Sequence, residues 1–101
     1  MLEIVTTRVF SNWAKRLRDK QAARAVALRL ARIRAGNLGD TKSVGGGVSE
    51  LRIHVGKGYR LYYCRRGKTL IILLCGGDKS SQAADIKRAQ AMADDLPEAQ
   101  P

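Results

Sequence analysis

The sequence has few cysteines and no long apolar run. Its two cysteines, Cys64 and Cys75, form no CxxC or Cys/His arrangement, so we expect two reduced, partly buried thiols and neither a metal site nor a cofactor. The longest purely apolar run, Leu70–Cys75, is far shorter than a membrane-spanning helix. The amino terminus lacks the charged-then-apolar pattern of a secretory signal, which predicts a cytoplasmic protein.

Acidic residues are also scarce. Nine Asp and Glu stand against 19 Lys and Arg, which gives a formal net charge of +10. Residues 1–40 carry nine basic and three acidic groups, and residues 41–79 carry eight and two, so each stretch has a net charge of +6. The positive charge therefore belongs to the body of the chain. Such a chain needs a polyanion, an anionic membrane or an acidic protein as its partner, and the missing apolar run makes the membrane the weakest of the three.

The sequence contains no repeat, low-complexity stretch or internal linker. Its 101 residues suffice for one modest core. We expect a single domain over residues 1–96, followed by a frayed tail at 97–101.

Helical periodicity appears in three places. Leu2–Val5 predicts a short edge strand, after which Thr6 or Thr7 can cap a helix. Asp19 can cap a second helix that ends near Gly36, and the two would form a helical hairpin. A last helix begins near Ser80 or Ser81. The apolar stripes of these helices are, in order, Phe10, Trp13, Ala14 and Leu17; Ala23, Val26, Ala27, Leu30 and Ile33; and Ile86, Ala89, Ala93 and Leu96.

Strand patterns fill the middle of the chain. A glycine-rich loop over residues 36–47 leads to an alternating strand at Val48–Val55, and a short loop at 56–58 leads to a return strand at Tyr59–Arg66. Leu70–Cys75 predicts a central strand buried on both faces, and the glycines at 76 and 77 are expected to end the sheet. The order βααβββα predicts an α+β fold with a mostly antiparallel sheet packed against the helical hairpin.

The hairpin places several polar side chains on one face. With residues 56–58 as the loop, His54 lies opposite Arg60 and Arg52 lies opposite Tyr62. Lys79 would lean over the rim. Cations gathered in this way repel one another unless an anion joins them, and a phosphodiester suits that position. Arginines would hold the phosphate, histidine would carry a proton, and Tyr62 would stack on a base or donate a proton.

Simpler interpretations stay open. Arg52 and Arg60 can be solvated strand residues, one of them paired with Glu50. His54 can be structural, and Tyr59 and Tyr63 fit core packing. The arginine-rich helix faces can be merely solvated, or can bind nucleic acid or an acidic protein segment.

Five ordered motifs between about Leu2 and Ala93 resemble the phage-derived Gp49-like branch of the RelE/ParE toxin superfamily, to which HigB toxins also belong. They are Phe10-x-x-Trp13, Arg34-Ala-Gly-Asn-Leu-Gly-Asp40, Gly47-Val-Ser-Glu-Leu-Arg52, Gly58-Tyr-Arg-Leu-Tyr62 and Gly76-Gly-Asp-Lys-Ser-Ser-Gln82.

The resemblance implies a RelE-like α+β toxin of a type II toxin–antitoxin system. Its partner would be an antitoxin of the helix-turn-helix type, and operator DNA would be bound only through the complex. RelE and HigB types enter the ribosomal A site and cleave mRNA there by attack of the 2′-hydroxyl. The basic positions of such enzymes correspond here to Arg52, His54, Arg60 and Lys79. Many also carry a tyrosine in the last helix, where this chain has Ile86.

Further candidates for RNA contacts lie on strands and loops: Lys42, Lys57, Arg65, Arg66 and Ser80. Two other functions stay open, because one fold can serve several. One is a ParE-like inhibitor of DNA gyrase without nuclease activity. The other is an inactive relative that acts as a binding or regulatory module.

Overall fold

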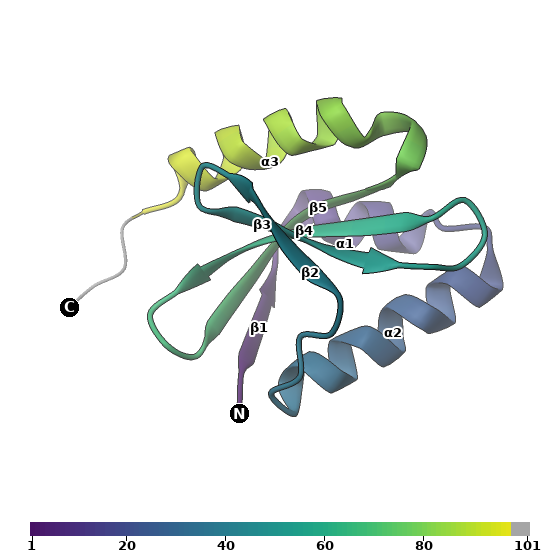
Figure 1. Ribbon diagram of the computed structural model, residues 1–101, viewed down its shortest axis with the longest axis horizontal. Coiled ribbons are helices and arrows are strands. Elements are labelled where there is room, and N and C mark those ends of the chain that lie inside the picture. The colour runs from purple at the N-terminus through teal and green to yellow at the C-terminus, as the bar shows by residue number, and fades with distance from the viewer. Residues whose placement is uncertain (98–101) are drawn as a thin grey trace.

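A computed structural model describes residues 1–97 and has three α-helices and a five-stranded sheet (Figure 1). The α+β prediction is confirmed. Most of the predicted tail, residues 98–101, lies outside the described part of the chain. The elements are β1 (Glu3–Thr6), α1 (Arg8–Lys15), α2 (Lys20–Arg34), β2 (Thr41–Gly45), β3 (Val48–Ile53), β4 (Tyr59–Arg66), β5 (Leu70–Asp78), a 3₁₀ turn η1 (Lys79–Ser81) and α3 (Gln82–Asp95).

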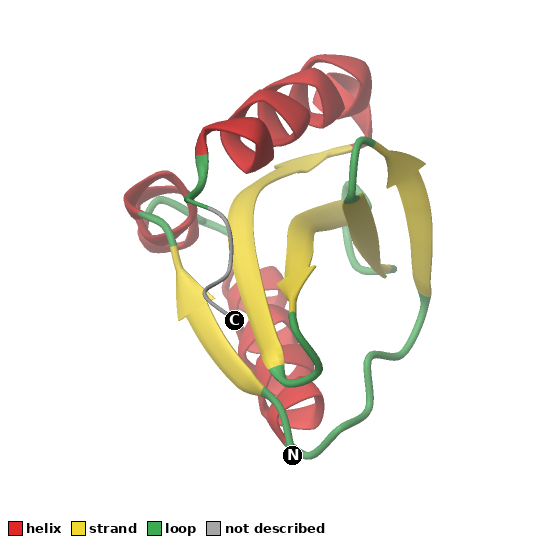
Figure 2. Ribbon diagram, turned by 90° about the vertical axis from the view of Figure 1, so that its left-hand side faces the viewer, coloured by secondary structure: helices red, strands yellow, loops and turns green. Residues whose placement is uncertain are grey.

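The strands are arranged in the order β1-β5-β4-β3-β2. Three of the four pairings are antiparallel, and only β1 runs parallel to its neighbour β5, so the mostly antiparallel sheet is confirmed. β1 is an edge strand as predicted. Figure 2 shows how strongly the strands curve as they cross the molecule.

The strand β2 was not predicted, and the expected order βααβββα is wrong on this point. Residues 41–45 were assigned to a glycine-rich loop because they carry no apolar alternation. They nevertheless pair with β3, with Thr41 opposite Leu51, and the Thr41 hydroxyl donates to the Glu50 carbonyl at 3.0 Å. An edge strand needs only backbone hydrogen bonds on one side, so exposed polar residues suffice.

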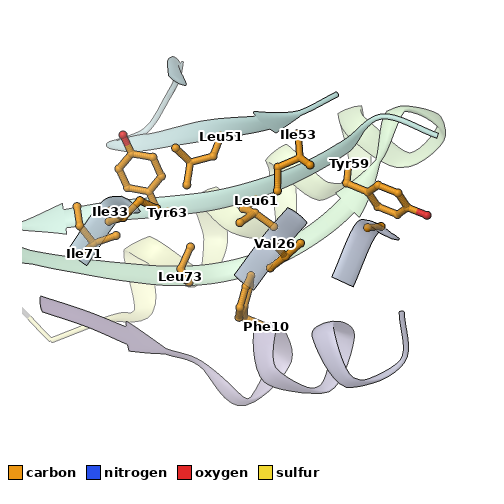
Figure 3. Packing of buried hydrophobic residues seen from close by; sticks show 11 residues of the cluster. Phe10, Val26, Ile33, Leu51, Ile53, Tyr59, Leu61, Tyr63, Ile71 and Leu73 are labelled. Carbon is orange, nitrogen blue, oxygen red and sulfur yellow. The ribbon is translucent and has the colours of Figure 1, made fainter. Parts of the chain in front are cut away.

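Both faces of the sheet are covered. α1 and α2 pack on one face, where their stripes meet the inward residues of the strands in a single apolar cluster (Figure 3). α3 packs on the other face through Ala89 and Ala93, against Val48, Cys64 and Leu74. The predicted packing of a helical hairpin on the sheet is therefore confirmed, and a second, smaller core lies under α3.

Two predicted helix caps are present. The Thr7 hydroxyl accepts from the Phe10 amide at 3.1 Å, and the Asp19 carboxylate accepts from the amides of Gln21 and Ala22 at 3.0 and 3.1 Å. Each satisfies amides that the first turn leaves without a partner. None of the helices within residues 1–97 has the length and apolar character needed to cross a membrane.

The glycines at 76 and 77 do not end the sheet, which corrects the prediction. β5 runs on to Asp78, and these glycines lie where helices approach the strand closely. A methyl group at Gly76 would come within 2.5 Å of the Trp13 ring, and one at Gly77 within 1.9 Å of an Asp85 carboxylate oxygen. Glycine serves close packing here rather than strand termination.

Gly76→Ala should therefore lower the free energy of unfolding by about 1–3 kcal/mol, because the indole of Trp13 must move to admit the methyl group. Urea unfolding measures this loss. Gly67→Ala is the comparison for backbone strain alone: Gly67 has a φ of 62°, which alanine rarely adopts and Gly76 does not have, but no atom lies within 4 Å of a methyl group added there. A Gly76→Ala loss no larger than that of Gly67→Ala would contradict the packing explanation.

Candidate functional site

The β3–β4 hairpin brings two arginines face to face. Arg52 pairs with Arg60, and Glu50 pairs with Tyr62. The predicted pairs of His54 with Arg60 and Arg52 with Tyr62 are wrong by two residues, because the strands separate after Ile53 and the loop starts earlier than expected. A shift of two residues keeps each side chain on its face, so Arg52, Arg60 and Tyr62 still share one face.

A buried carboxylate lies between these arginines. Glu50 is only 2% exposed, and its two oxygens accept from Arg52 Nε at 3.0 Å and from Gln82 Nε2 at 3.1 Å. Arg60 Nε lies 3.8 Å from Glu50 Oε2 and adds an ion pair. The anion that these cations require is thus supplied by the chain itself, which agrees with the simpler interpretation of Arg52.

Arg60 and Tyr62 lie deep under α3. Arg60 is 9% exposed and Tyr62 is fully buried, which puts the phenol ring out of reach of a nucleobase. Within residues 1–97, neither Arg60 Nε nor the Tyr62 hydroxyl has a hydrogen-bond partner. Burial raises the pKa of Tyr62 above its usual range, and the charges of Glu50 and Asp85 raise it further.

His54 is separated from this face. It follows the end of β3, and its ring Nε2 lies 2.7 Å from Asp40 Oδ2, with the histidine side chain 71% exposed. The hydrogen bond from His54 holds the pKa of Asp40 below its ordinary value, and the charges of Arg52 and Arg29 add to the effect. Asp40 therefore connects His54 to Arg52, because its backbone carbonyl also accepts from the Arg52 amide at 3.0 Å.

Arg29 of α2 holds the end of β3 and the loop before β2 together. Its guanidinium donates to the Arg52 carbonyl at 2.7 Å and more weakly to the Leu38 carbonyl at 3.4 Å. Burial lowers the pKa of Arg29. The arginine thereby joins α2, the loop before β2 and the end of β3, which positions both Asp40 and Arg52.

The remaining candidates divide between two ends of the sheet. Lys57, Lys79 and Ser80 lie at the same end as Arg60: the Lys79 side chain lies over Gly58, and Ser80 donates to Asp78. Lys42 of β2 is exposed, and its backbone lies opposite that of Glu50 in β3. Arg65 and Arg66 end β4, about 20 Å away. They donate to the carbonyls of Lys68 and Ala93, respectively.

Both cysteines are free thiols, and both are buried completely rather than partly as predicted; burial raises the pKa of each thiol. The part of the chain that the structure describes holds no group of three His, Cys, Asp or Glu residues suited to a metal ion.

Comparison with known proteins is decisive for the family. Residues 9–96 match the family described as phage-derived protein Gp49-like. The chain belongs to the Gp49-like family. This Gp49-like protein is also 45% identical over 95 residues to an uncharacterized protein of Haemophilus influenzae, an alignment that covers 94% of this chain and 96% of its relative.

Sequence reasoning missed two residues of the site in this Gp49-like protein, Asp40 and Gln82. It also missed that Glu50 pairs with both arginines. The alternation of β3 already placed Glu50 on the face of Arg52. Asp40 and Gln82 approach from a loop and from α3, and their contacts are long-range, so no local pattern indicated them.

Glu50→Ala should destabilise the protein by about 3–5 kcal/mol, because it leaves the buried Arg60 and the partly exposed Arg52 without their anion. Urea unfolding measures the loss. The double variant Glu50→Ala/Arg60→Met should regain part of the stability, since it lacks one of the two guanidiniums that lost their carboxylate partner. Unchanged stability of Glu50→Ala would show that the arginines do not depend on this carboxylate.

The Asp40–His54 contact predicts a pH dependence. A carboxylate whose pKa is lowered on folding stabilises the protein above its ordinary pKa of 3.8, and the contribution disappears as the pH falls through the lowered value. Asp40→Asn should thus be less stable than the parent protein near pH ~6, with the difference shrinking near pH ~3. Chemical denaturation at both pH values tests this. A difference that does not change with pH would contradict the assignment.

Proposed function

We propose that this Gp49-like protein is the toxin of a type II toxin–antitoxin system and cleaves messenger RNA in the ribosomal A site. The observation that carries the proposal is the opposition of Arg52 and Arg60 on adjacent strands, next to the His54–Asp40 contact. The net charge of +10 and the family membership add support.

The reaction needs neither metal nor cofactor. The 2′-hydroxyl of one nucleotide attacks the adjacent phosphorus, and the bond to the 5′-oxygen of the next nucleotide breaks. A 2′,3′-cyclic phosphate and a free 5′-hydroxyl result. One group accepts the proton of the 2′-hydroxyl, another protonates the leaving oxygen, and cations stabilise the charge that develops on the phosphate.

Arg52 is the arginine placed to meet a phosphate, because its side chain is 29% exposed and uses only Nε on Glu50. Its terminal nitrogens make no hydrogen bond with residues 1–97 and can serve the phosphate oxygens. Arg60 lies behind it and adds positive potential, and Lys79 adds a cation at the rim.

His54 is the proton carrier in this proposal. It is exposed, and Asp40 orients its ring as a carboxylate orients a general base. The phenol of Tyr62 is unsuited to that role in this structure because it is buried and its raised pKa keeps it protonated.

The partner in this proposal is an antitoxin of the helix-turn-helix type that covers the Arg52/Arg60 face or blocks entry into the ribosome. Operator DNA would be bound through that complex. An acidic segment of the antitoxin suits the surplus of positive charge.

Primer extension on a reporter mRNA in a bacterial translation extract tests the function. The wild-type protein should produce new cuts that require ribosomes, Arg52→Ala and Arg60→Ala should each reduce cutting by about 100-fold or more, and His54→Ala by about 100-fold.

Lys68→Ala is the matched control, because it removes an equal charge from the turn at the other end of β4. Each variant is first shown to be folded by its thermal unfolding transition. Intact mRNA in the presence of folded wild-type protein would refute the nuclease proposal.

The pairing of Arg52 and Arg60 with Glu50, which offsets one of their two charges, favours a second candidate, a ParE-like inhibitor of DNA gyrase that cuts no RNA. Blocked supercoiling with intact mRNA would mark this activity. Absence of both effects and of any growth defect would mark an inactive binding or regulatory relative.

A further inference from the structure

An open groove lies between the α1–α2 turn and the β3–β4 loop, at the end of the sheet where β4 begins. Figure 1 shows the two segments side by side, and a methyl group on Gly56 would come within 2.9 Å of Asp19 Oδ2. The groove has a volume of about 580 Å³, within the range of small-molecule sites. The residues that matter for its chemistry are Trp13, Arg16, Arg18, Lys57 and Tyr59.

Aromatic rings form one wall of the groove. The centroids of Trp13 and Tyr59 lie 6.4 Å apart, and Trp13 also packs on Phe10 at 5.8 Å. Gly76 lies directly against the indole. Trp13 is half-buried, so one part of its ring is fixed by the core while another part faces the groove. Figure 3 shows the Tyr59 hydroxyl pointing away from the core. A rigid, partly exposed indole is a stacking surface for a base.

Three cations of the groove are available to an anion. Among the described residues, Arg16, Arg18 and Lys57 make no ion pair. The two carboxylates nearby are already engaged: Asp19 caps α2, and Asp78 accepts from the amide and hydroxyl of Ser80. The groove therefore combines an aromatic wall with three cations against the two carboxylates of Asp19 and Asp78, and this net positive charge beside a ring suits a nucleotide.

The groove and the Arg52/Arg60 face lie at the same end of the sheet, on its two opposite sides. Tyr59 and Arg60 are consecutive residues of β4 on opposite faces of the sheet. The loop between β3 and β4 separates the two sites, and it carries Lys57 and the Gly58 that lies under Lys79. A strand of RNA that passed around this loop from Arg52 would meet Lys79 and Lys57 before it reached Trp13.

We propose that this groove binds one nucleotide of single-stranded RNA that flanks the cut phosphate. The base stacks on Trp13, and its phosphate lies between Arg18 and Lys57. This inference rests on the proposed function and extends it, because contacts to a flanking base would influence where the RNA is cut.

Trp13 is the single tryptophan of the chain, so its fluorescence reports directly on the groove. The experiment titrates the protein with a short single-stranded oligoribonucleotide that is 2′-O-methylated throughout and cannot be cleaved. We expect quenching of Trp13 with the wild-type protein. Arg18→Ala/Lys57→Ala should bind at least about tenfold more weakly, and its slope of log affinity against log salt should be smaller by about 1.4.

Arg34→Ala/Lys68→Ala is the matched control, since it removes two exposed charges from the opposite end of the molecule. It should retain the quenching and most of the affinity. Quenching that Arg18→Ala/Lys57→Ala does not weaken, or no quenching at all, would overturn the inference.

Two further outcomes separate the proposals. Quenching by RNA without any cleavage in the translation extract would support the groove and refute the nuclease. Normal cleavage without quenching would refute the groove and support the nuclease. Quenching by a polyglutamate peptide but not by RNA would overturn the inference in favour of an acidic protein partner.

Discussion

The contact between the buried carboxylate of Glu50 and the groups around it organises the α3 side of the molecule. Its oxygens join β3 through Arg52, β4 through Arg60 and α3 through Gln82. A charge that is 2% exposed is costly unless several donors meet it, so these three elements have one favourable arrangement. Ser81 and Asp85 continue the polar contacts along the start of α3 at 2.6 Å. The small apolar core beneath α3 alone would constrain the helix less.

Much of the fold could be predicted from the sequence because its signals are local. Alternation in residues 48–53 and 59–66 indicated β3 and β4, and Thr7 and Asp19 indicated where α1 and α2 begin. The hairpin register was wrong by two residues, because loop length is set by where strands separate and no pattern in residues 54–58 indicates that point. Side chains alternate between the faces of a strand, so a register error of two residues still assigned Arg52 and Arg60 to the same face.

The parts that could not be predicted depend on distant neighbours. β2 has no apolar alternation, and Gly76 and Gly77 resemble a turn until Trp13 and Asp85 are seen against them. Alternation shows which side chains share a face but not what covers that face. Tyr62 therefore appeared accessible, whereas α3 buries it completely. His54 was assigned to the face of Arg52 and Arg60, but β3 ends at Ile53, and the partner of His54, Asp40, approaches from a loop 14 residues earlier.

The parallel pairing of β1 with β5 has a consequence for how the chain is made. Glu3 pairs with Leu70 and Thr6 with Leu73, so the first strand finds its neighbour only after most of the polypeptide has been synthesised. Until then the apolar stripes of α1 and α2 lack the part of their packing surface that β5 supplies through Ile71 and Leu73. Contacts so distant in sequence favour slow folding. A nascent or truncated chain that ends before β5 therefore has no complete sheet, and the fold can be completed only when translation is nearly finished.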